Sequence, residues 1–152
     1  MNKLLVPAPK NSELMPAPSR LNPMRRISIL LADDDFYTRE LNAGVLLRSG
    51  YRVETAEDGV AAWQALNDDR YDLLITEHLM PWVTGLELIQ KLRSEARTLP
   101  VILASGMPPV EELNRHPGLQ IQATLQKTCT PEVLLTTVRQ VLGATGATDD
   151  SK

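Results

Sequence analysis

The sequence predicts an α/β protein with a doubly wound, five-stranded parallel sheet. Short runs of β-branched and aliphatic residues alternate along the chain with segments that have helical periodicity. A helix separates each strand from the next, and a parallel crossover of this kind is right-handed. Five successive strand–helix units therefore imply a sheet covered by helices on both faces.

The strand candidates are recognised by their β-branched or aliphatic composition. They are 27–32, 51–55, 73–76, 101–104 and 123–125. The first two helices are expected at 36–49, which Gly50 ends, and at 59–67. The residues grouped on one face are Tyr37, Leu41 and Val45 in the first helix, and Ala62 and Leu66, with Trp63 beside them, in the second.

The last three helices are predicted from capping signals. Thr84 and Glu87 form a capping box ahead of the buried stripe of Leu88, Ile89 and Leu92. The fourth helix lies between Pro108-Pro109 and His116-Pro117-Gly118, where His116 caps its end. In the fifth helix Thr130 is the N-cap and Pro131 the first residue. Its inward-facing residues are Leu134, Leu135, Val138, Val141 and Leu142.

Length and charge divide the chain into one domain and two tails. The 152 residues suit a single domain at 26–143. Residues 1–25 hold five of the eleven prolines and are expected to form a disordered or polyproline-like arm, and 144–152 a flexible tail. The domain carries a net charge of −5, which argues against nucleic-acid binding. No apolar run approaches a membrane span, and the single Cys129 fits a reducing compartment, so we expect a cytoplasmic protein.

Polar residues follow four of the five strands. Asp33, Asp34 and Asp35 follow the first, and Glu77, Ser105 and Lys127 follow the third, fourth and fifth. In an open doubly wound sheet the carboxyl ends of the strands form the ligand-binding edge. Carboxylates gathered there repel one another unless a cation lies among them, so the cluster suggests Mg²⁺. Taken singly, Asp35 is better explained as a helix N-cap, His78 as a loop residue and Cys129 as a packed side chain.

This ordered set of motifs resembles the receiver domain of bacterial two-component response regulators over residues 26–143. The matching segments are Ile29-Leu30-Leu31-Ala32-Asp33-Asp34-Asp35, then Asp72-Leu73-Leu74-Ile75-Thr76-Glu77-His78-Leu79-Met80-Pro81 with Gly85, then Pro100-Val101-Ile102-Leu103-Ala104-Ser105-Gly106, and Lys127. The resemblance implies a flavodoxin-like (βα)5 fold with strand order 2-1-3-4-5. It also implies Mg²⁺-assisted transfer of a phosphoryl group from a histidine kinase to an aspartate.

The resemblance also assigns roles to individual residues. Asp33 and Asp34 match the metal-binding acid pair, and the backbone carbonyl of Leu79 matches the group that completes the metal shell. Ser105 matches the switch hydroxyl and Lys127 the lysine that contacts phosphate. Glu77 stands at the phosphoacceptor position, and as a carboxylate it joins the expected metal ligands.

Three positions depart from the family pattern. Glu77 replaces the phosphoacceptor aspartate, and its extra methylene moves the carboxylate by roughly 1 Å or more, enough to cost about 100-fold in rate. Thr128 replaces the proline that usually follows the lysine, often after a cis peptide, and Thr124 replaces the switch aromatic. These departures predict an atypical receiver in which Glu77 pairs with Lys127.

Three functions are compatible with these residues. The first is a non-enzymatic, single-domain interaction module that binds a histidine kinase, a phosphotransfer protein or its own copy through the fourth helix, fifth strand and fifth helix. The second is a receiver phosphorylated on Glu77. The third is a haloacid-dehalogenase-like phosphatase using Asp33 and Asp35, although Tyr37 departs from the pattern of that family and the chain lacks room for a cap.

Overall fold

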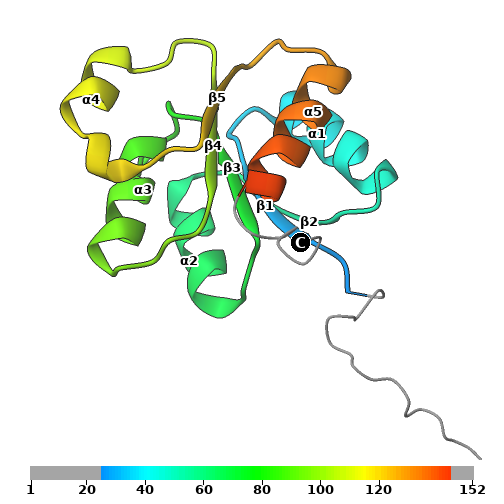
Figure 1. The fold of residues 1–152 in the computed structure, drawn as a ribbon, viewed down its shortest axis with the longest axis horizontal. Helices are drawn as coiled ribbons and strands as arrows, with labels where there is room; N and C mark the ends of the chain where they lie inside the picture. The colour runs from blue at the N-terminus through cyan, green and yellow to red at the C-terminus, as the bar shows by residue number, and fades with distance from the viewer. Residues whose placement is uncertain (1–24, 145–152) are drawn as a thin grey trace, which may run out of the picture.

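The computed structural model describes residues 25–144 and consists of five parallel strands in the order β2-β1-β3-β4-β5, as expected (Figure 1). In chain order the elements are β1 (Ser28–Ala32), α1 (Phe36–Arg48), β2 (Arg52–Ala56), α2 (Gly59–Asp68), β3 (Leu73–Thr76), α3 (Gly85–Ser94), β4 (Val101–Ser105), α4 (Val110–Arg115), the 3-10 turn η3 (Pro117–Leu119), β5 (Ala123–Gln126) and α5 (Pro131–Leu142). The expected arm and nearly all of the expected tail lie outside the described residues. None of the helices described is long and apolar enough to cross a membrane.

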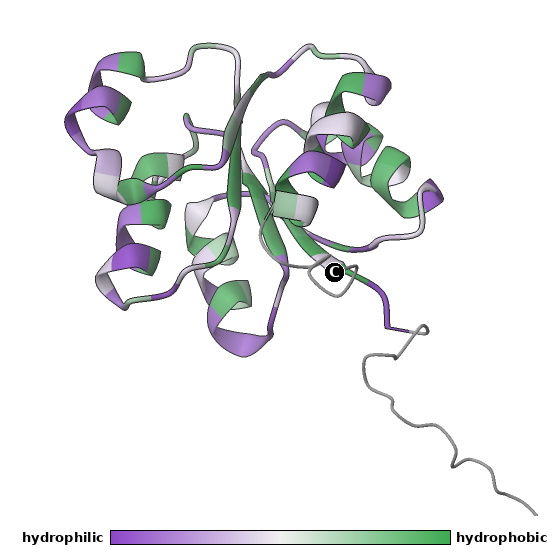
Figure 2. Cartoon of the chain, in the orientation of Figure 1, coloured by the Kyte–Doolittle hydropathy of each residue, from purple (hydrophilic) through white to green (hydrophobic). Residues whose placement is uncertain are grey.

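The strands divide the interior into two apolar cores. Along β1, Ile29 and Leu31 join the core beneath α1 and α5, whereas Leu30 and Ala32 join the core beneath α2 and α3. Side chains of a strand alternate between faces, so an apolar residue at every position is required when helices cover both sides. Figures 1 and 2 show these helix pairs on opposite sides of the sheet and the hydrophobic colouring concentrated on the strands.

The capping signals in the sequence mark helix boundaries correctly. The side chain of Asp35 accepts a hydrogen bond from the Thr38 amide at the start of α1, which confirms the N-cap interpretation. Thr84 and Glu87 form both hydrogen bonds of the predicted capping box at the start of α3. Thr130 caps α5, and the helix begins at Pro131 and ends at Leu142. These helix starts fix the loops that lead from the strand ends.

The prediction for the buried face of α1 is wrong in part. Tyr37 is 80% exposed and Leu41 63% exposed, and of the three grouped residues only Val45 is buried. The other buried residues of this helix are Ala43 and Leu46. Because an α-helix has 3.6 residues per turn, positions spaced by four drift around the axis, so residues 37 and 45 do not face the same way.

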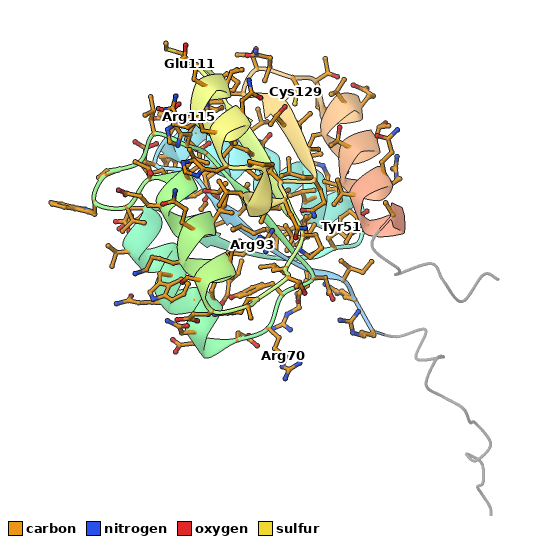
Figure 3. The ribbon with its side chains drawn as sticks, turned by 60° about the vertical axis from the view of Figure 1, so that its left-hand side comes forward. Tyr51, Arg70, Arg93, Glu111, Arg115 and Cys129 are labelled. Carbon is orange, nitrogen blue, oxygen red and sulfur yellow. The ribbon has the colours of Figure 1, made fainter. Side chains whose placement is uncertain are left out.

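The α4 segment lies at the surface of the domain, where Leu113 packs partly buried against the core. No residue of α4 is buried. Arg93 of α3 (labelled in Figure 3) donates hydrogen bonds to the carbonyls of Leu119 and Gln120, at 2.8 and 3.2 Å, and to that of Arg97 at 2.8 Å. The hydrogen bonds of this guanidinium therefore connect the end of α3 to the turn that leads into β5.

Candidate functional site

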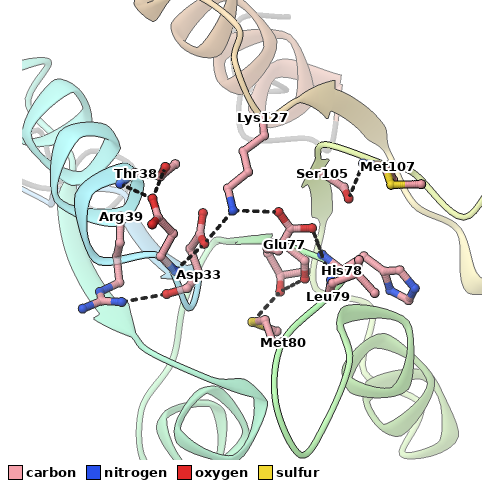
Figure 4. A network of polar contacts seen from close by, with 12 residues as sticks. Asp33, Thr38, Arg39, Glu77, His78, Leu79, Met80, Ser105, Met107 and Lys127 are labelled. Atoms are coloured by element: carbon pink, nitrogen blue, oxygen red, sulfur yellow. Dashed lines mark hydrogen bonds and ion pairs between the residues drawn. The ribbon is translucent and has the colours of Figure 1, made fainter.

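Three of the predicted site residues meet at the carboxyl edge of the sheet (Figure 4). Lys127, just after β5, lies with its Nζ 3.3 Å from Oδ1 of Asp33 and 3.2 Å from Oε1 of Glu77. Asp33 directly follows β1 and Glu77 directly follows β3, and these two strands are neighbours. The two carboxylate side chains are only 7% and 5% exposed, so the ammonium partly neutralises two buried acids.

The Glu77 carboxylate is held at both of its oxygens. Oε1 contacts Lys127, and Oε2 accepts hydrogen bonds from the backbone amides of His78, at 2.7 Å, and Leu79, at 3.2 Å. Burial raises the pKa of Glu77, but hydrogen bonds from Ser105, His78, Lys127 and Leu79 outweigh it and leave the pKa below its usual value. Glu77 therefore stays ionised while buried.

Asp33 has a different electrostatic environment. Its Oδ1 accepts a hydrogen bond of 2.9 Å from the Asp35 amide, and its backbone carbonyl accepts one of 2.7 Å from Arg39. Burial raises the pKa of Asp33 above its usual value, and the opposing effects of the Asp35 amide and Lys127 do not cancel that rise. Arg39 could not be predicted as a neighbour of the site, because its guanidinium contacts a main-chain oxygen, which any residue at position 33 would provide.

Ser105 and Lys127 complete the buried part of the site. Ser105 is 1% exposed, and its hydroxyl accepts a hydrogen bond from the Met107 amide at 3.2 Å. Burial lowers the pKa of Lys127, but its contacts with Glu77 and Asp33 outweigh that effect and raise the pKa above its usual value. The Lys127–Thr128 peptide bond is trans, as the replacement of proline predicts.

The loop between β3 and α3 positions Glu77 through close backbone contacts. The Gly85 amide donates a hydrogen bond of 2.7 Å to the His78 carbonyl. A Cβ at Gly85 would lie 2.3 Å from the Glu77 carbonyl oxygen, so the loop can close this tightly only around glycine. Trp82 in the same loop has φ of 72°, in the left-handed region, and its side chain is 81% exposed.

Of the other predicted metal ligands, Asp34 lies outside this network and Leu79 joins it through its backbone amide. Asp34 is exposed, and no ion pair of the described residues includes it. Leu79 contributes its amide to Glu77, while its side chain is 59% exposed. Among residues 25–144, no group of three or more His, Cys, Asp or Glu side chains is placed to hold a metal ion. The proposed magnesium ligands thus stay a prediction from the resemblance.

Comparisons with known proteins agree with the fold. The chain is 37% identical over 126 residues to the response regulators MprA of Mycobacterium ulcerans and Mycobacterium avium, covering 82% of this chain. It spans about half the length of these relatives, 53% and 54% respectively. The chemotaxis response regulator CheY4 of Vibrio cholerae is structurally similar, with a TM-score of 0.70 and 28% identity over 77% of this chain and 99% of that one.

A further structural match and a family profile extend the comparison. The signal receiver domain of an HD domain-containing protein from Pseudomonas fluorescens has a TM-score of 0.74 and 25% identity, over 81% of this chain and 99% of that one. The profile described as the response regulator receiver domain matches residues 29–139, most of the chain. The chain therefore belongs to the response regulator receiver domain family of two-component signalling.

Proposed function

We propose that this receiver domain is atypical, that Glu77 does not accept a phosphoryl group, and that the protein acts by binding other proteins rather than as an enzyme. The state of the Glu77 carboxylate supports the proposal. Its side chain is 5% exposed, Oε1 contacts Lys127 and Oε2 accepts two backbone amides. A nucleophile must bring a free oxygen into line with phosphorus, and roughly 1 Å of misplacement can cost about 100-fold in rate.

In this proposal Glu77 imitates the phosphorylated state only in part. Its carboxylate places one negative charge 3.2 Å from the Lys127 ammonium. A phosphoryl group carries about 1.5 to 2 negative charges and three acceptor oxygens, so the imitation is incomplete. Thr124 stands where an aromatic switch residue would report the state of the site, and its side chain is exposed at the edge strand β5.

The partner surface in this proposal is formed by α4, β5 and α5. A hollow of about 350 Å³ lies between α4, η3 and β5, and its lining includes Leu113, Leu119, Ile121 and Thr124. Val110, at the start of α4, is 58% exposed. We expect this surface to bind a histidine kinase or a phosphotransfer protein, or a second copy of the chain. Sedimentation velocity at rising protein concentration tests the last of these.

Intact mass spectrometry tests the central claim. The full chain is incubated with Mg²⁺ and a small phosphodonor such as acetyl phosphate, then measured without acid treatment. We expect no increase of about 80 Da in the wild-type chain. The matched variant Glu77→Asp restores the shorter stem and reports whether one methylene is the obstacle. Glu77→Gln controls for labelling at other residues.

The outcomes separate the competing functions. An adduct on the wild-type chain that Glu77→Gln abolishes would show that Glu77 is a working phosphoacceptor, and the proposal would fail. An adduct confined to Glu77→Asp would support it and identify the stem length as the cause. If neither chain is modified, the proposal stands, and Thr124 and Thr128 become the next positions to restore.

A further inference from the structure

Three arginines stand at the amino edge of the sheet, the end at which the parallel strands begin. Arg26 lies just before β1, Arg52 is the first residue of β2, and Arg70 lies in the loop ahead of β3. We call these three residues the arginine row. Because β2, β1 and β3 are neighbours and adjacent strands lie about 4.8 Å apart, the row extends over roughly 10 Å of the edge. Figure 3 shows Arg70 extending outward at this end of the domain.

The arginine row lines a groove with an excess of positive charge. The groove has a volume of about 1690 Å³, and its charged lining residues are five arginines and three aspartates. The domain as a whole has a net charge of −5, so this edge has the opposite sign to the rest of the molecule. A concave surface with an excess of two positive charges favours an anionic ligand.

The arginine row is the part of this charge that has no partner among the described residues. Two other arginines of the groove are already engaged. Arg25 forms an ion pair of 2.7 Å with Asp72, and Arg97 donates a hydrogen bond of 2.7 Å to the Leu66 carbonyl. Within residues 25–144, no ion pair or side-chain hydrogen bond includes a guanidinium of the arginine row, and all three residues are exposed. A free guanidinium presents a planar set of N–H donors that matches a carboxylate.

The chain itself supplies carboxylates next to this groove. The last helix, α5, ends at Leu142, which lines the groove and belongs to the same apolar core as Ile27, beside the arginine row. Asp149 and Asp150 follow Leu142 by seven and eight residues. Seven extended residues reach at most about 25 Å, which exceeds the length of the arginine row.

We propose that the groove at the amino edge binds residues 145–152 of its own chain, with the carboxylates of Asp149 and Asp150 paired to the arginine row. Charge favours this segment over the other end of the chain, because residues 1–24 contain three basic residues and one acidic residue and so have the same sign as the groove. The remaining charged residue of the tail, Lys152, finds Asp68 and Asp69 in the same groove.

The covalent connection makes this contact stable enough to form. An exposed ion pair is weak, so a separate acidic peptide would bind this groove poorly. A short tether raises the effective concentration of the tail to the millimolar range. The groove also lies at the opposite edge of the sheet from Lys127 and Glu77, so this inference goes beyond the proposed function and does not depend on it.

Paramagnetic relaxation enhancement in the full chain tests the proposal. A nitroxide is attached at Ser151→Cys in a Cys129→Ser background, and the amide signals of the ¹⁵N-labelled chain are recorded with the nitroxide oxidised and then reduced. The amides of Ser28 and Tyr71 report on the groove, which both residues line. Gly106, which follows β4 at the carboxyl edge, is the reference.

We expect the two groove amides to lose most of their intensity in the parent chain and the reference to keep its intensity. Arg52→Gln, Arg70→Gln and the double variant Asp149→Asn/Asp150→Asn should each restore much of the lost signal. So should 1 M NaCl, in which the Debye length is about 3 Å. The matched control is Arg115→Gln, which removes an exposed arginine of α4 and should leave the broadening unchanged.

The proposal is overturned if the groove amides are not broadened, or if Arg52→Gln and Arg70→Gln behave like Arg115→Gln. Broadening of a ¹⁵N-labelled chain by a separate nitroxide-labelled chain would also overturn it, because a second copy would then be the occupant. If Cys129→Ser does not fold, the amide chemical shifts of Asp149 and Asp150 in the unlabelled chain replace the nitroxide. A salt response that Arg52→Gln reduces would support the proposal, and an equal response in both chains would overturn it.

Discussion

Replacing Lys127 with methionine removes the ammonium that contacts both buried carboxylates. The side chains of Asp33 and Glu77 are 7% and 5% exposed, so neither gains much solvation in its place. Removing one partner of a buried ion pair costs about 3–5 kcal/mol. Lys127 is 25% exposed and Glu77 keeps its two amide hydrogen bonds, so we expect Lys127→Met to lose about 2–3 kcal/mol at pH 7.

The pH dependence of this loss identifies its electrostatic origin. Without Lys127 the two adjacent carboxylates repel, so the pKa of at least one rises in the folded state. The folded variant then binds a proton that the unfolded chain releases, and its stability increases as the pH falls through the raised pKa. We therefore expect the difference between Lys127→Met and the wild type to be smaller at pH 5 than at pH 7. Urea unfolding followed by circular dichroism measures both differences.

A double-mutant cycle isolates the contact with Glu77. Glu77→Gln removes one of the two repelling charges, so Lys127→Met should cost less in that background than in the wild type. Lys91→Met is the matched control, because Lys91 is an exposed lysine beside Trp63 on another face. The reasoning is refuted if Lys127→Met costs no more than this control at pH 7. Equal losses at both pH values, or strict additivity in the cycle, would also refute it.

Three further predictions concern the same loops and the same lysine. Gly85→Ala should lower the free energy of unfolding by about 1–3 kcal/mol in urea, since a Cβ would lie 2.3 Å from the Glu77 carbonyl; an unchanged midpoint would contradict this close contact. Trp82→Gly should raise the free energy of unfolding by about 0.5–1 kcal/mol, because φ of 72° suits glycine and the 81% exposed residue loses little buried surface. A lower free energy of unfolding would mean that the indole ring contributes to packing. The pKa of Lys127 is raised in the folded state, so the stability that its charge contributes is fully present below the ordinary pKa of 10.5 and is lost as the pH rises above it. In urea titrations, the difference in unfolding free energy between the wild type and Lys127→Met should therefore shrink only at strongly alkaline pH. A shrinkage already at pH 9 would contradict it.

The fold could be predicted from the sequence where local signals and burial agree. Leu73–Thr76 is a strand with the predicted bounds, because four consecutive buried residues leave its ends unambiguous. The helix from Pro131 to Leu142 was equally well marked by its cap and its apolar stripe. For α1 the apolar residues occur on several faces, and only packing against the sheet selects Ala43, Val45 and Leu46 for burial.

The site could be predicted only to the level of which strand ends meet. The carboxyl ends of parallel strands lie at one edge, so Asp33, Glu77 and Lys127 were expected together. The direction of each side chain depends on loop geometry that residue order does not specify. Asp33 is 5% exposed, whereas its neighbour Asp34 is exposed. The hydrogen bond from the His78 amide to Glu77 Oε2 could not be predicted from the sequence either.

Two carboxylates buried together need a positive partner, and the nature of that partner decides whether the site can change its state in response to a signal. A metal ion or a phosphoryl group exchanges with solvent or with another protein, so its occupancy can carry a signal. Lys127 is part of the chain, and its contacts with Asp33 and Glu77 are present in every molecule that adopts this arrangement. If the site is fixed in this way, the variable step in signalling is the binding of a partner to the α4, β5 and α5 surface. A variant that frees Glu77 from Lys127 should then change affinity for that partner without any phosphodonor.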